Sequence, residues 1–204
     1  MLDYTCESSQ RLDQSRQVAH LLSLPMRTVV FIAYDIIGDI HGHAEILTTL
    51  LAKLGYRHHL GAWRHTDRSA IFVGDFIDRG PGQLETRIVR EMLDAGTARA
   101  VTGNHEFNAI AWHTPDPDYN GQHLRRRVSK NRQQHGAFLA ETEDDPVLHS
   151  ELVAWFLTLP LWLELPELRL IHARWDRRDD VRTRWWDAMA DTYRKSAILD
   201  EPPW

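Results

Sequence analysis

Three short polar clusters along the chain carry residue types suited to metal chemistry. In chain order, the clusters are Asp39 with His41, Asp75 with Asp78, and Asn104 with His105. Each cluster closely follows an apolar run that favours a β-strand. Open α/β sheets bind ligands at the carboxyl ends of their strands, so we expect the three clusters to meet at one edge of a sheet.

The same residues offer ligands for two metal ions. Asp39 and His41 are two residues apart at a strand end, so both side chains can project the same way and share one ion. Asp75 is a natural bridge, because a carboxylate can offer one oxygen to each of two ions. Asn104 would join the second ion, and His172, after a fourth apolar run, would add an imidazole. Carboxylate, imidazole and amide ligands without a thiolate suit Mn, Fe or Zn.

Such a pair of ions, together with the residues beside it, suits phosphoryl transfer. Two metal ions about 4 Å apart can generate a hydroxide and hold the attacking and leaving oxygens of an in-line displacement. Arg79 can bind two phosphate oxygens with its planar guanidinium group. His105 can protonate the leaving oxygen while Asp78 holds its other ring nitrogen. We therefore take His105, Asp78 and Arg79 as the candidate catalytic residues.

Strands and helices in alternation must position these side chains. We expect strands over residues 29–37, 70–73 and 98–101, and helices over residues 44–54, 84–93 and 104–112. This alternation predicts an α/β layered fold. The second half is less regular, with helices expected over residues 123–140 and 147–157 and strands over residues 161–165 and 168–171. The polar residues between the first helix and the second strand, including His58 and His59, are expected to form a solvated connection.

The composition favours a globular protein and argues against general binding to nucleic acids or membranes. The chain has 204 residues, of which 43% are apolar and 26% charged, as is typical of a globular domain. Its 29 acidic residues outnumber its 24 basic ones, so general binding to nucleic acids or membrane surfaces is not expected. The longest apolar run, residues 29–34, is far shorter than the roughly 20 residues of a membrane span. A single cysteine, Cys6, excludes an internal disulfide, and we expect a cytoplasmic protein.

The three clusters lie in segments that resemble the signature motifs of calcineurin-like metallophosphoesterases. These segments are Gly38–Gly42, Gly74–Gly80 and Gly103–Glu106. They look most like the branch of serine/threonine protein phosphatases and symmetrical dinucleoside tetraphosphatases, and Ile171–Ala173 resembles the next metal motif of that branch. The resemblance implies a two-sheet β-sandwich flanked by helices, with two divalent metal ions between the sheet edges. Manganese is the first expectation, with iron or zinc as alternatives.

One feature of the family is missing from this sequence. The family has a further metal-binding histidine in a Gly-His motif well downstream of the position of His172, and no Gly-His pair follows His172 here. We therefore expect a chain truncated at its C-terminal end, with a second metal site weaker than the first. The expected domains are a loosely attached extension over residues 1–27 and an incomplete phosphoesterase domain over residues 28–204.

Three functions are compatible with these observations. The leading hypothesis is a metal-dependent phosphoesterase that hydrolyses phosphomonoesters, on proteins or small molecules, or nucleotide phosphoanhydrides. The missing histidine motivates an alternative, a weakly active or inactive metal-binding relative that acts by binding a partner. A second alternative is a phosphodiesterase or nuclease of the same superfamily, although the sequence Asp78-Arg79-Gly80 resembles the monoesterase branch.

Two features outside the motifs could bind substrate. His113 lies in a predicted loop after the third motif, and loops often carry binding residues. The segment from His123 to His135 contains no acidic residue and five basic ones, namely Arg125, Arg126, Arg127, Lys130 and Arg132. This segment either attracts an anionic substrate or forms the solvated face of a helix.

Overall fold

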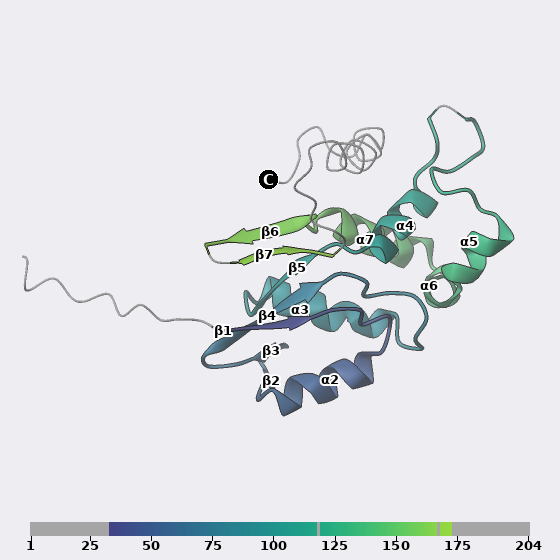
Figure 1. Ribbon diagram of the computed structural model, residues 1–204. Helices are drawn as coiled ribbons and strands as arrows, with labels where there is room; N and C mark the ends of the chain where they lie inside the picture. Colours follow the sequence, from purple (N-terminus) through teal and green to yellow (C-terminus); the bar gives the residue numbers. More distant parts are fainter. Residues whose placement is uncertain (1–32, 118, 167, 173–204) are drawn as a thin grey trace, which may run out of the picture. The chain divides into compact units, whose positions relative to one another are not determined.

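The computed structural model describes residues 33–117, 119–166 and 168–172. The predicted extension over residues 1–27 and the segment after His172 lie outside the described residues. The described elements are, in chain order, β1 (Ala33–Ile37), α2 (Ala44–Lys53), β2 (Arg57–His59), β3 (Ala62–Arg64), β4 (Arg68–Val73), the 3-10 turn η1 (Leu84–Thr86), α3 (Arg87–Asp94), β5 (Ala98–Val101), α4 (Asn104–His113), α5 (Ser129–Gln134), α6 (Gly136–Thr142), α7 (Pro146–Leu157), β6 (Trp162–Leu165) and β7 (Leu168–Ile171) (Figure 1).

A parallel sheet of three strands, in the order β1-β4-β5, positions the polar clusters. Ile36 of β1 pairs with Ile71 of β4, and Phe72 of β4 pairs with Ala100 of β5. Parallel neighbours need crossover connections, and these contain α2 and α3 (Figure 1). The three strands consequently end at one edge, and a polar cluster follows each of them. This arrangement confirms the predicted α/β class.

Apolar side chains from both crossover helices pack against the sheet. Leu47 and Leu51 of α2 are buried, as are Val89 and Met92 of α3, and Phe72 of β4 is fully buried in the same core. Burying an aliphatic or aromatic side chain of this size contributes roughly 1.5–3 kcal/mol. The core therefore holds the strand ends, and with them the polar loops, in a fixed relation.

A hairpin of β6 and β7 brings His172 to the same edge. The two strands are antiparallel, with Trp162 opposite Ile171. The N–H of Thr102, directly after β5, donates to the carbonyl of Pro160 at 2.8 Å, which ties the hairpin to the sheet. The described residues form sheets of three, two and two strands. They do not show the two-sheet sandwich that the resemblance implies, which stays a prediction.

The prediction of a single helix over residues 123–140 is wrong. Two short helices, α5 and α6, occupy its second half, and the residues before α5 are not helical. The N–H groups of Leu124 and Arg125 donate to the carbonyls of Thr114 and Ala111, at 3.0 and 2.9 Å, at the end of α4. These tertiary hydrogen bonds hold Leu124 and Arg125 against the end of α4, and the helical conformation begins only at Ser129.

The predicted polar connection after α2 is a β-hairpin formed by β2 and β3. Leu60 and Gly61 at its turn both have positive φ, 50° and 74°. A two-residue turn of this kind usually starts with Asn, Asp or Gly, so Leu60 gave no sequence signal for it. His58 and His59 are exposed, as expected. None of the described helices is both long and apolar enough to cross a bilayer.

Candidate active site

The polar clusters come together where β1, β4 and β5 end. Two groups of side chains there could each hold a metal ion, because one ligand atom from every member lies within 4.8 Å of the others. One group is His41, Asp75 and His105, and the other is Asp39, Asp75 and His172. Asp75 belongs to both groups, which is the position expected of a bridging carboxylate.

The Oδ2 atom of Asp75 lies at the centre of this cluster. Its distances to Nε2 are 3.8 Å for His41, 3.9 Å for His105 and 3.3 Å for His172. Ligand atoms that each lie about 2.0–2.2 Å from a shared ion are themselves roughly 3–4 Å apart. The spacing of these donor atoms therefore fits divalent metal ions. Asn104 completes the cluster, with Oδ1 3.1 Å from Nε2 of His172.

Backbone carbonyls determine which nitrogen of two of these histidines faces the cluster. Nδ1 of His41 lies 3.2 Å from the carbonyl oxygen of Ile77, and Nδ1 of His172 lies 2.6 Å from that of Val73. A carbonyl only accepts hydrogen bonds, so both Nδ1 atoms donate and Nε2 is the atom available to a metal. Hydrogen bonding to Asp75 raises the pKa of His172 to about 9, so a metal ion would have to displace a proton from this ring.

The loops of the first two motifs have an unusual backbone. Five of their non-glycine residues have positive φ: Asp39 (53°), His41 (46°), Asp75 (54°), Asp78 (71°) and Arg79 (67°). Elsewhere in the described residues, only Leu60 shares this property among non-glycine residues. The left-handed conformation costs an L-residue on the order of 1–2 kcal/mol. Strain of this kind persists where the surrounding structure enforces it, as is common at functional sites.

A close approach between the second and third motifs holds these loops. A Cβ atom on Gly103 would overlap the backbone nitrogen and Oδ1 of Asp75, and one on Gly74 would overlap the backbone of Gly103. Glu106 is fully buried and accepts the N–H groups of Asp75 at 2.8 Å, Phe76 at 2.7 Å and Gly103 at 2.9 Å. Its carboxylate therefore joins the loops after β4 and β5.

The predicted pairing of Asp78 with His105 is present, with Oδ2 and Nδ1 2.7 Å apart. Asp78 is only 1% exposed. Burial acts to raise the pKa of Asp78, but hydrogen bonds from His105 and His135 outweigh it and keep this pKa below its usual value. The same bond to Asp78 raises the pKa of His105. A protonated His105 can donate a proton to a leaving oxygen.

Comparison with known proteins identifies the family. A sequence model of the calcineurin-like phosphoesterases matches residues 33–193. The chain belongs to this family. Relatives named asymmetrical bis(5′-nucleosyl)-tetraphosphatase PrpE include one from Halalkalibacterium halodurans, 49% identical over 74 residues, which are 35% of this chain and 30% of the relative. The relative from Bacillus subtilis is 45% identical over 75 residues, which are 36% of this chain and 31% of the relative.

The matched segments thus span less than a third of the length of these relatives. Solved structures were also compared with this chain. A serine/threonine phosphatase from Saccharomyces cerevisiae has a TM-score of 0.43 at 20% identity, over 67% of this chain and 36% of its own. A cold-active protein tyrosine phosphatase has a TM-score of 0.48 at 18% identity, over 83% of this chain and 50% of its own.

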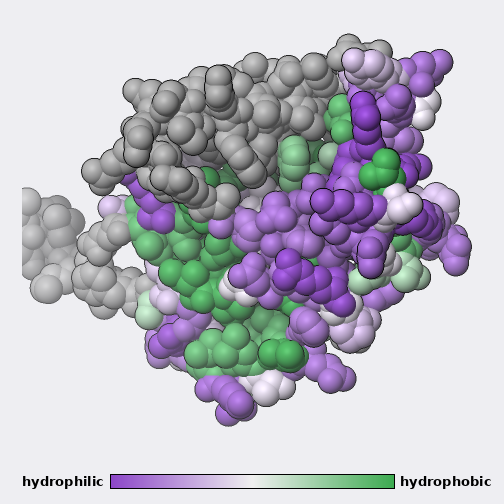
Figure 2. All heavy atoms as spheres, turned by 45° about the vertical axis from the view of Figure 1, so that its right-hand side comes forward, coloured by the Kyte–Doolittle hydropathy of each residue, from purple (hydrophilic) through white to green (hydrophobic). Residues whose placement is uncertain are grey.

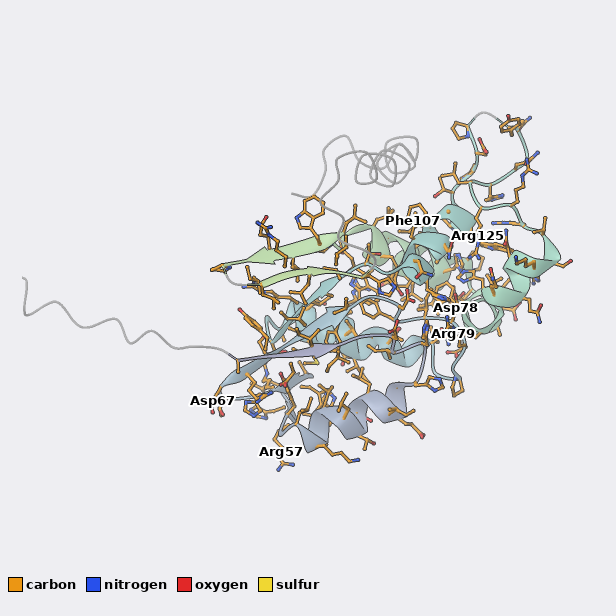
Figure 3. The ribbon with its side chains drawn as sticks, viewed as in Figure 1. Arg57, Asp67, Asp78, Arg79, Phe107 and Arg125 are labelled. Carbon is orange, nitrogen blue, oxygen red and sulfur yellow. The ribbon has the colours of Figure 1, made fainter. Side chains whose placement is uncertain are left out.

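A pocket of about 770 Å³ lies beside the Asp78/His105 pair. Asn104 and Arg79 line it from the motifs, and Arg125 lines it from the part of the basic segment that precedes α5. Figure 3 shows Asp78, Arg79 and Arg125 close together. In Figure 2 the part of the face that carries α5 and α6 is mainly hydrophilic. The basic segment is therefore not only a solvated surface, because one of its arginines reaches the site.

The predicted substrate contact His113 is placed differently. It ends α4, is not among the residues that line the pocket, and its ring lies 5.2 Å from that of His149. Burial, followed by the charge of Arg127, lowers the pKa of His113. The structure does not bring this side chain to the motifs.

Sequence reasoning missed His135. This residue is fully buried, and its Nδ1 lies 3.0 Å from Oδ1 of Asp78. Its Nε2 is buried with no hydrogen-bond partner among the described residues. Since Asp78 accepts from both His135 and His105, His135 supports the orientation of the Asp78/His105 pair. His135 is 57 residues from Asp78 along the chain and belongs to no motif, so the sequence carried no signal for it.

Proposed function

We propose that this protein is a metal-dependent phosphoesterase that hydrolyses phosphomonoesters, on proteins or small molecules, or nucleotide phosphoanhydrides. The observation that carries the proposal is the position of Asp75, whose Oδ2 faces the Nε2 atoms of His41, His105 and His172. Metal-ligating residues and a hydrogen-bonded acid pair in one cluster are what phosphoryl transfer requires.

Asp75, which belongs to both ligand groups, would contribute to both metal sites. His41 would hold the first ion, and Asn104 and His172 the second. Asp39 lies 4.0 Å from Nε2 of His41 and also groups with His172, so it can serve either ion. We expect manganese first. When bound, such ions supply a nucleophile at neutral pH and neutralise charge on the phosphoryl group.

Three side chains of this chain would act on the substrate directly or through a neighbour. Arg79, an exposed side chain at the pocket, would bind two oxygens of the transferred phosphoryl group. His105 would give its Nε2 proton to the leaving oxygen, because Asp78 already occupies its Nδ1. Asp78 would keep the ring in this orientation. The names of the PrpE relatives support a nucleotide phosphoanhydride as one substrate class.

The proposal is tested by hydrolysis of phenyl phosphate in the presence of Mn²⁺, with Asp75→Asn as the decisive variant. Loss of the bridging carboxylate should reduce kcat at least 100-fold, since losing even an indirect partner of a metal costs about 10–100-fold. Asp67→Asn is the matched control, because Asp67 is exposed and hydrogen-bonded to Thr66, away from the cluster (Figure 3).

Equal rates in the two variants would overturn the assignment of Asp75. Absence of turnover in folded, metal-loaded protein would favour the alternative of a metal-binding relative that acts by binding a partner. Faster hydrolysis of bis(4-nitrophenyl) phosphate than of phenyl phosphate would favour the phosphodiesterase alternative.

A further inference from the structure

The pocket beside His105 lies on the side where a leaving group would depart. Asp78, Arg79, Asn104 and His105 line it, whereas Asp39, His41, Asp75 and His172 do not. The transferred phosphoryl group would lie at the metal sites, and His105 would protonate the oxygen that leaves. The remainder of the substrate, attached to that oxygen, would therefore extend into the pocket.

The wall of this pocket is mainly polar. Apart from the ring of His105 it contains no aromatic side chain, and its largest aliphatic side chain is that of Ala137. Pockets for drug-sized organic ligands are instead lined mainly by hydrophobic and aromatic side chains. Asn108, Gln133, Gln134 and Arg125 supply amide and guanidinium groups here. This wall suits a leaving group that is itself charged and polar, and it offers little to an apolar one.

Arg125 is held at the pocket by its neighbours. The N–H groups of Leu124 and Arg125 are bonded to carbonyls at the end of α4. Arg127 donates to the carbonyl of Trp112 at 3.1 Å, and its guanidinium lies 5.4 Å from the centre of that ring. With the chain fixed on both sides, Arg125 reaches the pocket and donates from Nη2 to Oε1 of Gln134 at 2.9 Å.

The charge of Arg125 is available to an anion. Within the described part of the chain, no carboxylate forms an ion pair with Arg125, whereas Arg132 on α5 pairs with Glu143. Burial lowers the pKa of Arg125 and the Asp78 carboxylate acts in the opposite direction. Arginine stays protonated in proteins, so the pocket contains a fixed positive charge. A half-buried cation of this kind binds oxyanions more strongly than an exposed one.

We propose that this pocket is a subsite for a second oxyanion, carried on the leaving group of the substrate, and that Arg125 binds it. The inference rests on the proposed function, since the metal cluster and His105 define which side of the substrate the pocket receives. The second oxyanion is a phosphate, as in a diphosphate, or a carboxylate. Arg79 binds the phosphoryl group that is transferred, and Arg125 binds the group that leaves.

The reaction at this subsite is an ordinary hydrolysis. The oxygen of a water molecule forms a new bond to phosphorus, and the bond between phosphorus and the leaving oxygen breaks. His105 gives its proton to the leaving oxygen. The attacking water loses one proton to solvent, and His105 takes up one proton from solvent, so the ring is protonated again. When the transferred phosphoryl group is terminal, the products are inorganic phosphate and the protonated leaving group, whose oxyanion stays bound to Arg125 until release.

Binding of three small phosphonates to the Mn²⁺-loaded protein, measured by calorimetry, tests the subsite. Methylphosphonate carries one oxyanion, phosphonoacetate adds a carboxylate, and methylenediphosphonate adds a second phosphonate. In Arg125→Gln we expect methylenediphosphonate, phosphonoacetate or both to bind about 10- to 100-fold more weakly, the loss typical of a charge-assisted contact. Methylphosphonate should change by less than about threefold. The probe that loses affinity identifies the second group as phosphate or carboxylate.

Arg126→Gln is the matched control, because Arg126 is the next residue, carries the same charge and is exposed. Arg125→Lys keeps the charge without the planar fork and should recover part of the lost affinity. Equal weakening of all three probes in Arg125→Gln, equal losses in Arg126→Gln, or no loss at all would overturn the subsite. These measurements do not depend on turnover. If the protein hydrolyses none of the substrates but Arg125→Gln still weakens binding of the second anion, the proposed function is refuted and the anion subsite stands.

Discussion

The candidate metal cluster and the pocket beside it are built in different ways. In the cluster, the Nδ1 atoms of His41 and His172 are hydrogen-bonded to backbone carbonyls. The loops there contain residues in the left-handed conformation and glycines packed so closely that a Cβ atom would overlap its neighbours. In the pocket, Arg79, Arg125 and Gln134 reach inward with long side chains from exposed or half-buried positions. The backbone therefore fixes the cluster, whereas long polar side chains form most of the pocket wall.

This difference separates two tasks. Metal ligands must hold their geometry to within a few tenths of an ångström, which a strained and closely packed backbone ensures. Recognition of the rest of the substrate tolerates adjustment and can be changed by single substitutions on the surface. Substitutions in the cluster should consequently affect folding, metal binding and every substrate, and those in the pocket should affect only selected ligands.

The largest effect is expected where an added methyl group meets the cluster. A Cβ on Gly103 would overlap Asp75, so Gly103→Ala should destabilise the fold by about 1–3 kcal/mol, typical of overpacking, and abolish Mn²⁺ binding. The comparison is Gly136, which lines the pocket and where an added methyl group would meet nothing within 4 Å. Because alanine favours a helix more than glycine does, Gly136→Ala in α6 should stabilise the fold by up to about 1 kcal/mol. Urea unfolding and Mn²⁺ titration of both variants check this. Equal behaviour would remove the distinction between the two regions.

His105 lies where the two regions meet, and its loss should affect chemistry most. His105→Asn should lower kcat for phenyl phosphate about 10²–10⁴-fold, as expected for a general acid. The effect should be smaller with 4-nitrophenyl phosphate, whose leaving group is a weaker base. His58→Asn, at an exposed position on β2, is the control. A variant that loses Mn²⁺ together with activity would show that His105 is a metal ligand rather than the acid.

Glu106 should affect stability more than substrate preference. Glu106→Gln puts an amide NH₂ where a carboxylate oxygen accepts buried N–H groups, so at least one of these donors loses its partner. We expect a loss of about 1–3 kcal/mol in the free energy of unfolding. Urea denaturation measures it, with Glu91→Gln on the exposed side of α3 as the control. A variant as stable as the control would show that Glu106 does not join the two loops.

The smallest of these effects is expected at His135. His135→Leu removes the donor to Oδ1 of Asp78 and should lower kcat for phenyl phosphate about tenfold with KM unchanged. His135→Gln retains an N–H donor and should recover part of that loss. Steady-state kinetics of both variants, with urea denaturation to confirm folding, make the comparison. An increase in KM with kcat unchanged would show that His135 contributes to substrate binding and does not position Asp78.

The cluster could be predicted from sequence because its information is local. Asp39, Asp75 and Asn104 each stand beside a glycine after an apolar run, so strand, turn and ligand are specified within a few residues. His172 could be predicted for the same reason, since it directly follows a strand. Parallel strand order then brings the three motif positions to one edge without further information, and the β6–β7 hairpin adds the fourth.

The pocket could not be predicted, because distant contacts form it. Residues 123–140 have the composition of a helix, and hydrogen bonds from Leu124 and Arg125 to the end of α4 break that pattern. No sequence motif indicates that Leu124 and Arg125 would bond to the end of α4. The pairing of His135 with Asp78 likewise depends on how α5 and α6 pack. The sequence indicated a basic segment and left open whether it faced substrate or solvent.

Whether Asp75 bridges two metal ions is tested by the number and environment of the Mn²⁺ ions that the folded protein binds. Equilibrium dialysis gives the stoichiometry, and electron paramagnetic resonance shows whether neighbouring ions are magnetically coupled. Because Asp75 belongs to both ligand groups, we predict two ions per chain with a coupled spectrum that disappears in Asp75→Asn. One isolated ion per chain, or a coupled pair unaffected by this substitution, would show that Asp75 does not bridge two ions.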